Sequence, residues 1–381
     1  MITIRQGSRV YQLLCILACV GEFPMRSIHL LGDSSSWGKL IQRLSQKQDF
    51  RFPEGEQVYS IRMLTISGTG KLKSARLYKA ALPLLERTVP DAYRYYMDVY
   101  GRYNHTGKEN EIGRAHRVAE TTAMCLLSGI TPFQYDLPQL QMVSRKNLIP
   151  DAPSFYMSRE LKNAGDDGGN RTKFSRITGA VFYRGGCYAV YNSRDALMKW
   201  NGQGEMKTRL YLAQLARMNA DIPDVDSAVM LGSGYNLALR TLGSLDGITR
   251  SDMRFDRIYQ HIHFVPMNVF GAKLLKTLTV PDWNEKLMQL LFDEEDRSYH
   301  QGLFEYDAIE NGVFIFSFLD SDIVRLSRFR SAVSGREFEI LCYLDQVSFL
   351  RKYLGNHVRL RLVEIDLVAA ELIGGEEDQN E

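Results

Sequence analysis

The sequence predicts a multidomain α/β protein, and three observations support this fold class. The chain has 381 residues, 45% of them hydrophobic and 24% charged, which is the composition of a globular protein large enough for two or three domains. From residue 176 onwards, strand-like and helix-like segments alternate, as in a largely parallel sheet covered by helices on both faces. Residues 1–150 carry 20 Lys and Arg against 12 Asp and Glu, whereas the rest of the chain carries 27 against 33. The first part is therefore expected to contact a polyanion.

Residues 1–72 predict a first domain of three short helices followed by a β-hairpin. The helices are expected over 8–20, 24–31 and 37–46, because apolar residues recur there at a spacing of three to four. Strands are expected over 49–52 and 58–66, joined by a turn at 53–56. This order is that of a winged helix-turn-helix domain, whose third helix enters the major groove of DNA while the wing contacts phosphates.

The polar side of the third predicted helix has the residue types that contact DNA. Long polar side chains can bond to base edges, and serines at the start of a helix suit phosphate contacts. The expected DNA-binding residues are Ser34, Ser35, Ser36, Lys39, Gln42, Arg43, Arg51, Arg62, Lys71 and Lys73. The alternative is that this trihelical unit serves dimerisation or protein docking.

A family resemblance rests on this first domain and on two segments that follow it. These segments are Leu64-Thr65-x-x-Gly68-x-Gly70-Lys71 and the helix with Arg114-Ala115-His116-Arg117-Val118-Ala119-Glu120. In this order, over about the first third of the chain, they resemble the replication-relaxation family, winged-helix proteins of plasmids and integrative elements in Gram-positive bacteria. The resemblance implies a DNA-binding protein of a mobile genetic element, acting in replication, conjugative transfer or its regulation.

Residues 73–150 are expected to form a helical connector, followed by a linker over 151–172. The segment Gly68 to Lys73 is not a Walker loop, because Thr65 and Leu72 stand where that motif needs Gly and Ser or Thr. His116 and Glu120 lie one helical turn apart. Without a third ligand nearby, a hydrogen bond within the helix is a better interpretation of this pair than a metal site.

Residues 173–373 predict an α/β domain with two similar halves, 173–267 and 300–368. Each half has the order hairpin, helix, strand, helix, strand. The first half places these elements at 177–192, 206–218, 228–231, 235–244 and 261–267, and the second at 303–318, 322–333, 338–343, 346–354 and 358–366. Helices over 269–278 and 282–292 join the halves, and 374–381 is expected to be a disordered acidic tail.

One pattern in this domain suggests metal chemistry on a strand. His261 and His263 alternate on a predicted strand and therefore share a face. Such a pair binds the metal in enzymes that nick single-stranded DNA with a tyrosine, for which Tyr299 and Tyr353 are nominal candidates. The alternative is two histidines on the solvent-facing side of a strand, and this is the favoured interpretation.

Two further patterns are weaker. Glu205 and Lys207 match the Glu-x-Lys of metal-dependent nucleases, with Asp195 as the nearest upstream acid, but Glu205 fits better as an acid at a helix start. Gly232-Ser233-Gly234 opens a helix after a strand, where open α/β sheets bind anions.

The favoured function is sequence-specific binding of double-stranded DNA, with the α/β domain forming a homodimer or docking a replication or transfer protein. No cofactor is expected for this function. Two alternatives stay open: a metal-dependent DNA nickase or nuclease that uses His261 and His263, or Glu205 and Lys207, with Mg²⁺ or Mn²⁺, and an interaction scaffold without nucleic acid. Five scattered cysteines and the lack of a 20-residue apolar run predict a cytoplasmic chain without membrane association.

Overall fold

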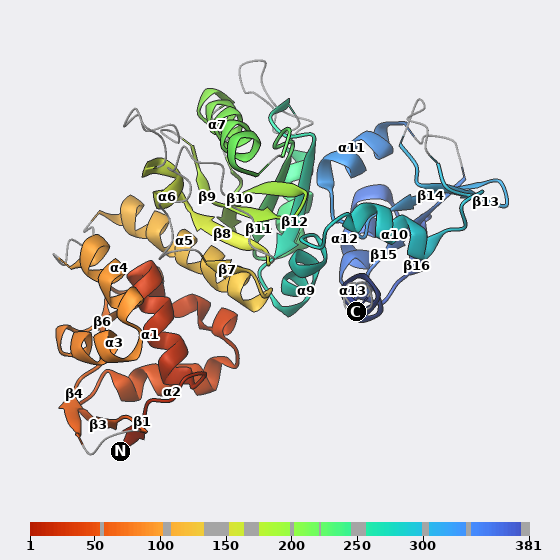
Figure 1. The fold of residues 1–381 in the computed structure, drawn as a ribbon. Helices are drawn as coiled ribbons and strands as arrows, with labels where there is room; N and C mark the ends of the chain where they lie inside the picture. Colours follow the sequence, from red (N-terminus) through yellow and green to blue (C-terminus); the bar gives the residue numbers. More distant parts are fainter. Residues whose placement is uncertain are drawn as a thin grey trace. The chain divides into compact units, whose positions relative to one another are not determined.

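The computed structural model describes most of the chain as two compact units. Unit 1 comprises Met1–Leu127 and Pro132–Pro138, and unit 2 comprises Ser128–Thr131 and Gln139–Glu381. The described residues are 1–53, 57–101, 108–132, 152–163, 175–198, 202–220, 222–244, 257–298, 305–332 and 337–374. About 50% of the structure is helix, and the described strands form four sheets of mixed orientation (Figure 1). The predicted mixed α/β class is confirmed.

The helices of unit 1 pack around a buried first helix. Leu13, Leu14 and Leu17 of this helix are buried, and it ends at Gly21, whose φ of +76° lies in the left-handed region that suits glycine. Three later helices, α3 to α5, contact it. The helices are α1 (Arg9–Val20), η1 (Met25–Leu31), α2 (Ser34–Leu44), η2 (Gly70–Leu72), η3 (Lys79–Ala81), α3 (Leu82–Thr88), α4 (Pro90–Tyr100) and α5 (Glu109–Leu127).

Unit 1 also holds two small sheets. One has the order β1 (Ile2–Thr3), β3 (Gln48–Arg51), β4 (Tyr59–Ile61), and the other β2 (Glu22–Pro24), β6 (Ser74–Leu77), β5 (Leu64–Ser67). A single strand over 58–66 was a wrong prediction, because Met63 leaves the ladder: its N–H donates to the Leu44 carbonyl at 3.1 Å and its carbonyl accepts from Tyr78 at 2.8 Å. Since β6 pairs with β2, the expected domain boundary at residue 72 passes through a sheet.

Unit 2 begins with a six-stranded sheet of order β12-β11-β10-β9-β8-β7. Strands β10, β11 and β12 run parallel, whereas β8, β9 and β10 are antiparallel. The elements are β7 (Thr131–Pro132), β8 (Ser154–Met157), α6 (Ser158–Asn163), β9 (Ile177–Tyr183), β10 (Gly186–Arg194), α7 (Gly202–Ala220), β11 (Ser227–Gly232), α8 (Tyr235–Gly243) and β12 (His261–Pro266). The linker expected over 151–172 is corrected in part, because β8 is a buried strand of this sheet and α6 follows it.

A second sheet in unit 2 has the order β13-β14-β15-β16, with the same antiparallel hairpin and two parallel additions as β9-β10-β11-β12. The elements are α9 (Val269–Thr277), α10 (Trp283–Leu291), β13 (Ala308–Glu310), β14 (Val313–Ser317), α11 (Ile323–Ala332), β15 (Phe338–Cys342), η6 (Leu344–Gln346), α12 (Val347–Leu354), β16 (Arg359–Leu362) and α13 (Ile365–Gly374). The predicted order of elements in the two halves is therefore found in the strand pairing.

Two boundaries in the second half were wrong. The hairpin begins at Ala308 instead of residue 303, and the strand predicted to reach residue 366 ends at Leu362. The helix α13 was missed, because its Ile-Asp-Leu-Val start continues the apolar pattern of the strand before it. The acidic tail after Gly374 lies outside the described residues. None of the helices in the described part of the chain combines the length and apolar character that crossing a bilayer requires.

The orientation of α2 can be tested with two neighbouring residues. Ile41 is 0% exposed, whereas Gln42 is exposed. We expect Ile41→Ala to lower the free energy of unfolding by about 2–5 kcal/mol through lost burial and a cavity. Gln42→Ala should change it by less than about 0.5 kcal/mol. Urea unfolding measures both values, and equal effects would show that α2 does not bury this side.

Candidate functional site

The outward side of α2 carries long polar side chains. Lys39, Gln42 and Arg43 are exposed, as the sequence predicted, and Arg43 donates to Gln48 Oε1 at 3.3 Å. The opposite side of the helix is held in the core by three buried residues, Trp37, Ile41 and Leu44. The helix therefore presents its cationic side on a rigid support.

The start of α2 lies three residues earlier than predicted. Ser34 and Ser35 are exposed in its first turn, and Ser36 donates its backbone N–H to the Asp33 carboxylate at 2.8 Å. This hydrogen bond lowers the pKa of Asp33. Asp33 is therefore the cap of α2, and its negative charge lies beside the serines expected to contact phosphate.

The other cations predicted to bind DNA separate into two groups. Arg51 is exposed on β3, and Arg62 lies between β4 and β5 with its guanidinium 3.9 Å from the centre of the Tyr78 ring. Lys71 and Lys73 are also exposed, but on the turn between β5 and β6. The Lys73 carbonyl there accepts from the backbone N–H of Met25 at 2.9 Å, which places this turn beside the start of η1.

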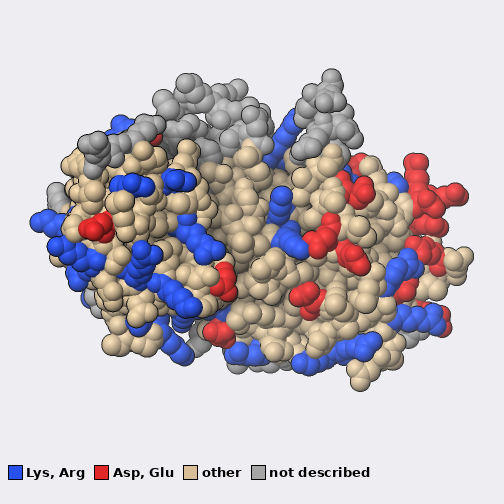
Figure 2. Space-filling view, turned by 90° about the horizontal axis from the view of Figure 1, so that it is seen from below, with Lys and Arg blue, Asp and Glu red and all other residues tan. Residues whose placement is uncertain are grey.

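Basic side chains predominate on the visible face of unit 1. Figure 2 shows Lys and Arg gathered on the left side of the view, with few Asp and Glu among them. Lys47, between α2 and β3, is exposed as well and was not in the predicted set. Its position one residue before a strand gave no periodic signal that separates it from an ordinary surface lysine.

His116 and Glu120 lie on a buried side of α5, but the hydrogen bond expected between them is not formed, because neither ring nitrogen of His116 has a hydrogen-bond partner among the described residues. Ser27 donates to Glu120 at 2.6 Å, and His116 Nε2 lies 3.8 Å from Glu22 Oε2. Burial raises the pKa of Glu22, but the nearby imidazole of His116 and the hydrogen bonds from Arg76 lower it to about 2. The pair therefore belongs to a structural network inside unit 1.

Glu205 and Lys207 do not form one site. Both lie in the first turns of α7, where Glu205 is 0% exposed and Lys207 is exposed. The Glu205 carboxylate accepts from Ser175 Oγ at 2.7 Å, the Arg176 N–H at 2.9 Å and Tyr191 at 2.9 Å. Burial raises the pKa of Glu205, and these donors oppose that effect. The predicted helix-start position is confirmed, and the nuclease pairing of these two residues is not supported.

His261 and His263 lie on one face of β12, and each has an oxygen partner from the segment between β14 and α11. His261 Nδ1 is 2.7 Å from Asp322 Oδ2, and His263 Nδ1 is 2.9 Å from the Asp320 carbonyl oxygen. The two rings are nearly parallel, with centroids 6.4 Å apart. The strand prediction was right, but the favoured interpretation of two solvent-facing histidines was wrong for His263, which is 3% exposed. Their oxygen partners come from residues about sixty positions later in the chain.

Asp322 connects β12 to α11. Its side chain is 0% exposed and accepts from His261, from the N–H of Ile262 at 3.0 Å, and from the N–H groups of Val324 at 2.9 Å and Arg325 at 3.3 Å. Burial raises the pKa of Asp322, but the His261 hydrogen bond and the charge of His263 lower it to about 2. The hydrogen bond with Asp322 in turn raises the pKa of His261, against the effect of burial.

A pocket of about 510 Å³ opens beside these two histidines. Its other polar groups include three carboxylates that surround Arg325. The residues that line it include Arg184, His261, His263, Asp282, Trp283, Glu305, Tyr306, Asp307, Asp320 and Arg325. Arg325 donates to Asp307, its Nε lies 3.2 Å from Glu305 Oε2, and its Nη1 lies 3.9 Å from Asp320 Oδ2.

The nickase alternative lacks its remaining parts among the described residues. No group of three or more His, Cys, Asp or Glu is arranged there to hold a metal ion. Tyr299 lies outside the described residues. Tyr353 is 9% exposed on α12, with Phe349 stacked on one side and the Arg330 guanidinium 4.5 Å from its ring centre.

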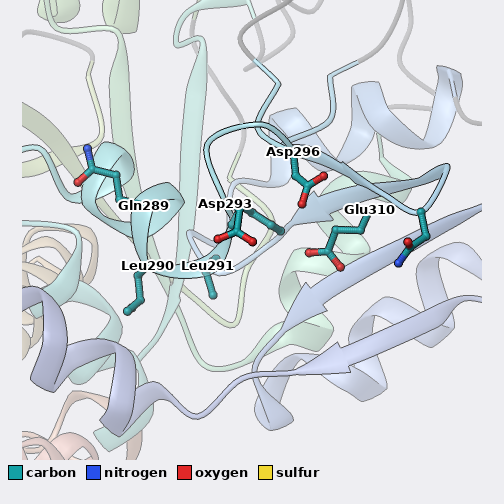
Figure 3. Close-up of a pocket in the computed structure, with 8 residues that line it drawn as sticks. Gln289, Leu290, Leu291, Asp293, Asp296 and Glu310 are labelled. Atoms are coloured by element: carbon teal, nitrogen blue, oxygen red, sulfur yellow. The ribbon is translucent and has the colours of Figure 1, made fainter.

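Two other surface features have structural explanations. Figure 3 shows Asp293, Asp296 and Glu310 around a pocket of about 340 Å³, and Glu310 is paired with Arg361 at 2.8 Å. At the predicted anion site, a Cβ on Gly232 would lie 2.6 Å from Phe264, so glycine is needed there for packing. The Ser233 N–H also donates to the Arg194 carbonyl at 2.9 Å.

No protein-family model matches the chain, and neither does any curated protein or any solved structure. Functional conclusions therefore rest on the residues and geometry of the chain itself.

The connection made by Asp322 can be tested by removing its carboxylate. We expect Asp322→Ala to lower the free energy of unfolding by on the order of 3 kcal/mol, because three backbone N–H groups and His261 lose their acceptor. Asp366→Ala is a matched control, since Asp366 is 72% exposed in its ion pair with Lys273, and it should cost less than about 1 kcal/mol. Urea unfolding measures both, and similar losses would contradict the assignment.

The stability difference between the wild-type protein and Asp322→Ala is expected to depend on pH. The pKa of Asp322 in the folded protein, about 2, lies below the ordinary value of an aspartate, about 3.9. Its contribution to stability is therefore complete above that ordinary value and is lost as the pH falls towards 2. The difference in unfolding free energy between wild type and Asp322→Ala should be smaller at pH 3 than at pH 6. A constant difference would contradict an ionised Asp322.

Proposed function

We propose that unit 1 is a winged helix-turn-helix domain that binds double-stranded DNA, with α2 as the helix that enters the major groove. The observation that carries this proposal is the exposed set of Lys39, Gln42 and Arg43 on the side of α2 opposite its buried residues. Arginine and lysine bond to the acceptor edge of guanine, and glutamine to adenine. A short helix held firmly by the core is the usual support for such side chains.

The β3–β4 hairpin follows α2 directly and is the proposed wing. Arg51 on β3 is exposed, and Lys47 leads into the same strand. Arg62, at the end of the hairpin, is stacked on Tyr78 and so loses less side-chain freedom on binding a phosphate. Phosphate contacts of this kind position the protein on the duplex, whereas base contacts from α2 supply specificity.

We further propose that the chain acts in replication, conjugative transfer or regulation of a plasmid or integrative element. This proposal depends on the resemblance of the first third of the sequence to the replication-relaxation family. A homodimer through the α/β unit would place two α2 helices on two half-sites of the DNA, and docking of a replication or transfer protein is the alternative use of that unit.

DNA binding is tested with a double variant and a matched control. Lys39→Ala/Arg43→Ala removes two cations from α2, and Arg94→Ala/Lys108→Ala removes two exposed cations from α4 and the start of α5. We expect the first to weaken retention of duplex DNA by roughly 10–100-fold and to reduce the slope of log K against log salt by about 2. The control should change either value little, as measured by fluorescence anisotropy over a salt series.

Two outcomes would contradict this function. Equal weakening by both double variants would indicate attraction by net charge without a role for α2. Absence of salt-dependent DNA binding in the wild-type protein would favour the protein-docking alternative for unit 1.

A further inference from the structure

We infer that the pocket beside His261 and His263 binds a ligand with a cationic, donor-rich head, such as an alkyl guanidinium or ammonium group. This site lies in unit 2 and does not depend on DNA binding by unit 1. Its basis is the arrangement of hydrogen-bond acceptors that the described residues present to the pocket.

The hydrogen-bond partners of His261 and His263 determine the tautomer of each ring. Nδ1 of His261 faces a carboxylate, and Nδ1 of His263 faces a backbone carbonyl, at 2.7 and 2.9 Å. Both oxygens only accept, because Asp322 is ionised, so each Nδ1 carries the hydrogen. In the neutral ring the lone pair then lies on Nε2. When neutral, each imidazole is therefore an acceptor at its other end, and the raised pKa of His261 means that its ring takes this form only at higher pH.

The two histidine acceptors lie beside one pocket. His261 and His263 occupy alternate positions on β12, so they share a face, and both line the same pocket of about 510 Å³. Their rings are inclined by only 13°, with centroids 6.4 Å apart. Two parallel imidazoles at this separation suit a head with several N–H donors better than a single-donor group.

The rest of the pocket lining has more acidic than basic side chains. Asp282, Glu305, Asp307 and Asp320 contribute four carboxylates, against the two guanidinium groups of Arg184 and Arg325. Arg325 already contacts three of these carboxylates, so its donors are engaged within the wall of the pocket. Burial raises the pKa of Asp320, against the effect of Arg325. Without the charge of Asp320 the lining still has three carboxylates against two guanidinium groups, and this excess of negative charge and of acceptors disfavours a phosphate.

Aromatic residues complete the site. Trp283 and Tyr306 are partly exposed in the lining, and an aromatic ring face attracts guanidinium and ammonium groups. The Trp283 ring is edge-on to His263, with centroids 5.8 Å apart, and its Nε1 donates to Tyr188 at 3.0 Å. These contacts hold Trp283 in place, so the wall is formed before any ligand arrives.

The tautomers are measured first, on the full chain labelled with ¹⁵N at histidine. Long-range ¹H–¹⁵N NMR at pH 8.5 should show the hydrogen on Nδ1 of both His261 and His263. A hydrogen on Nε2 of either ring would overturn the inference, because that ring would then be a donor towards the pocket.

Binding is measured next with agmatine, which carries a guanidinium and an ammonium group. We expect saturable shifts of the His261 and His263 Nε2 signals at pH 8.5, and none with inorganic phosphate. Glu305→Gln should weaken agmatine binding by roughly tenfold. The matched control is Glu337→Gln, which removes an exposed carboxylate outside the pocket and should leave binding unchanged.

A second test uses only the wild-type protein, so its result does not depend on whether a variant folds. Agmatine binding should weaken as the pH is lowered. Protonated His261 cannot accept a hydrogen bond at Nε2. The charged groups that face His261 are Asp322 and Asp320 from the β14–α11 segment and Asp226 before β11, with His263 on its own strand. The inference would be overturned if agmatine did not bind, or if it bound equally or more strongly at pH 5.5. It would also be overturned if phosphate bound instead of agmatine, or if Zn²⁺ or Mn²⁺ formed a complex that excludes agmatine.

Discussion

The carboxylate of Asp322 is the constraint on which the arrangement of unit 2 depends. It is buried and ionised, so it requires donors. It finds them on the strand β12, from His261 and Ile262, and at the first N–H groups of the helix α11. A buried charge without these partners would cost several kcal/mol. The Asp322 carboxylate therefore caps α11, in the second half of the α/β domain, and fixes β12, the edge strand of the first half. The ring of His263, parallel to that of His261, is oriented by the neighbouring Asp320 carbonyl.

The turn that carries Asp320 and Asp322 is itself held in an unusual conformation. Ser321 has a φ of +53°, a region that residues with a Cβ rarely adopt, and its side chain is fully buried. Its hydroxyl is 2.7 Å from the Tyr235 hydroxyl and accepts from Gln346 at 2.7 Å, while its carbonyl accepts from Phe264 on β12. Strain of this kind persists where the surroundings over-determine it. Here the residues on either side of Ser321 have different roles: Asp320 lines the pocket, and the Asp322 carboxylate accepts from β12 and from the start of α11.

Local sequence signals predicted most elements, and long-range contacts determined what they do. The hairpin predicted within 303–318 turns at Asn311 and Gly312, whose φ values of +51° and +81° suit an Asn-Gly turn. The alternating His261 and His263 correctly indicated a strand. By contrast, Asp322 gave no signal, because its partner His261 is sixty-one residues away and an aspartate before a helix is an ordinary cap. The split between β4 and β5 also depended on Leu44 and Tyr78, which no pattern within 58–66 could indicate.

The two proposed sites have opposite electrostatic character, and this bears on the nuclease alternative. A phosphodiester at the pocket of unit 2 would meet carboxylates there, and the guanidinium of Arg325 is already paired with two of them. Binding to a polyanion releases many counterions and falls steeply with salt, whereas capture of one cationic head is only screened. Histidines of the kind that hydrolyse phosphodiesters act beside cations or metal ions that stabilise developing negative charge. The described residues around His261 and His263 supply the reverse, so recognition of a cation is the chemistry that this pocket favours.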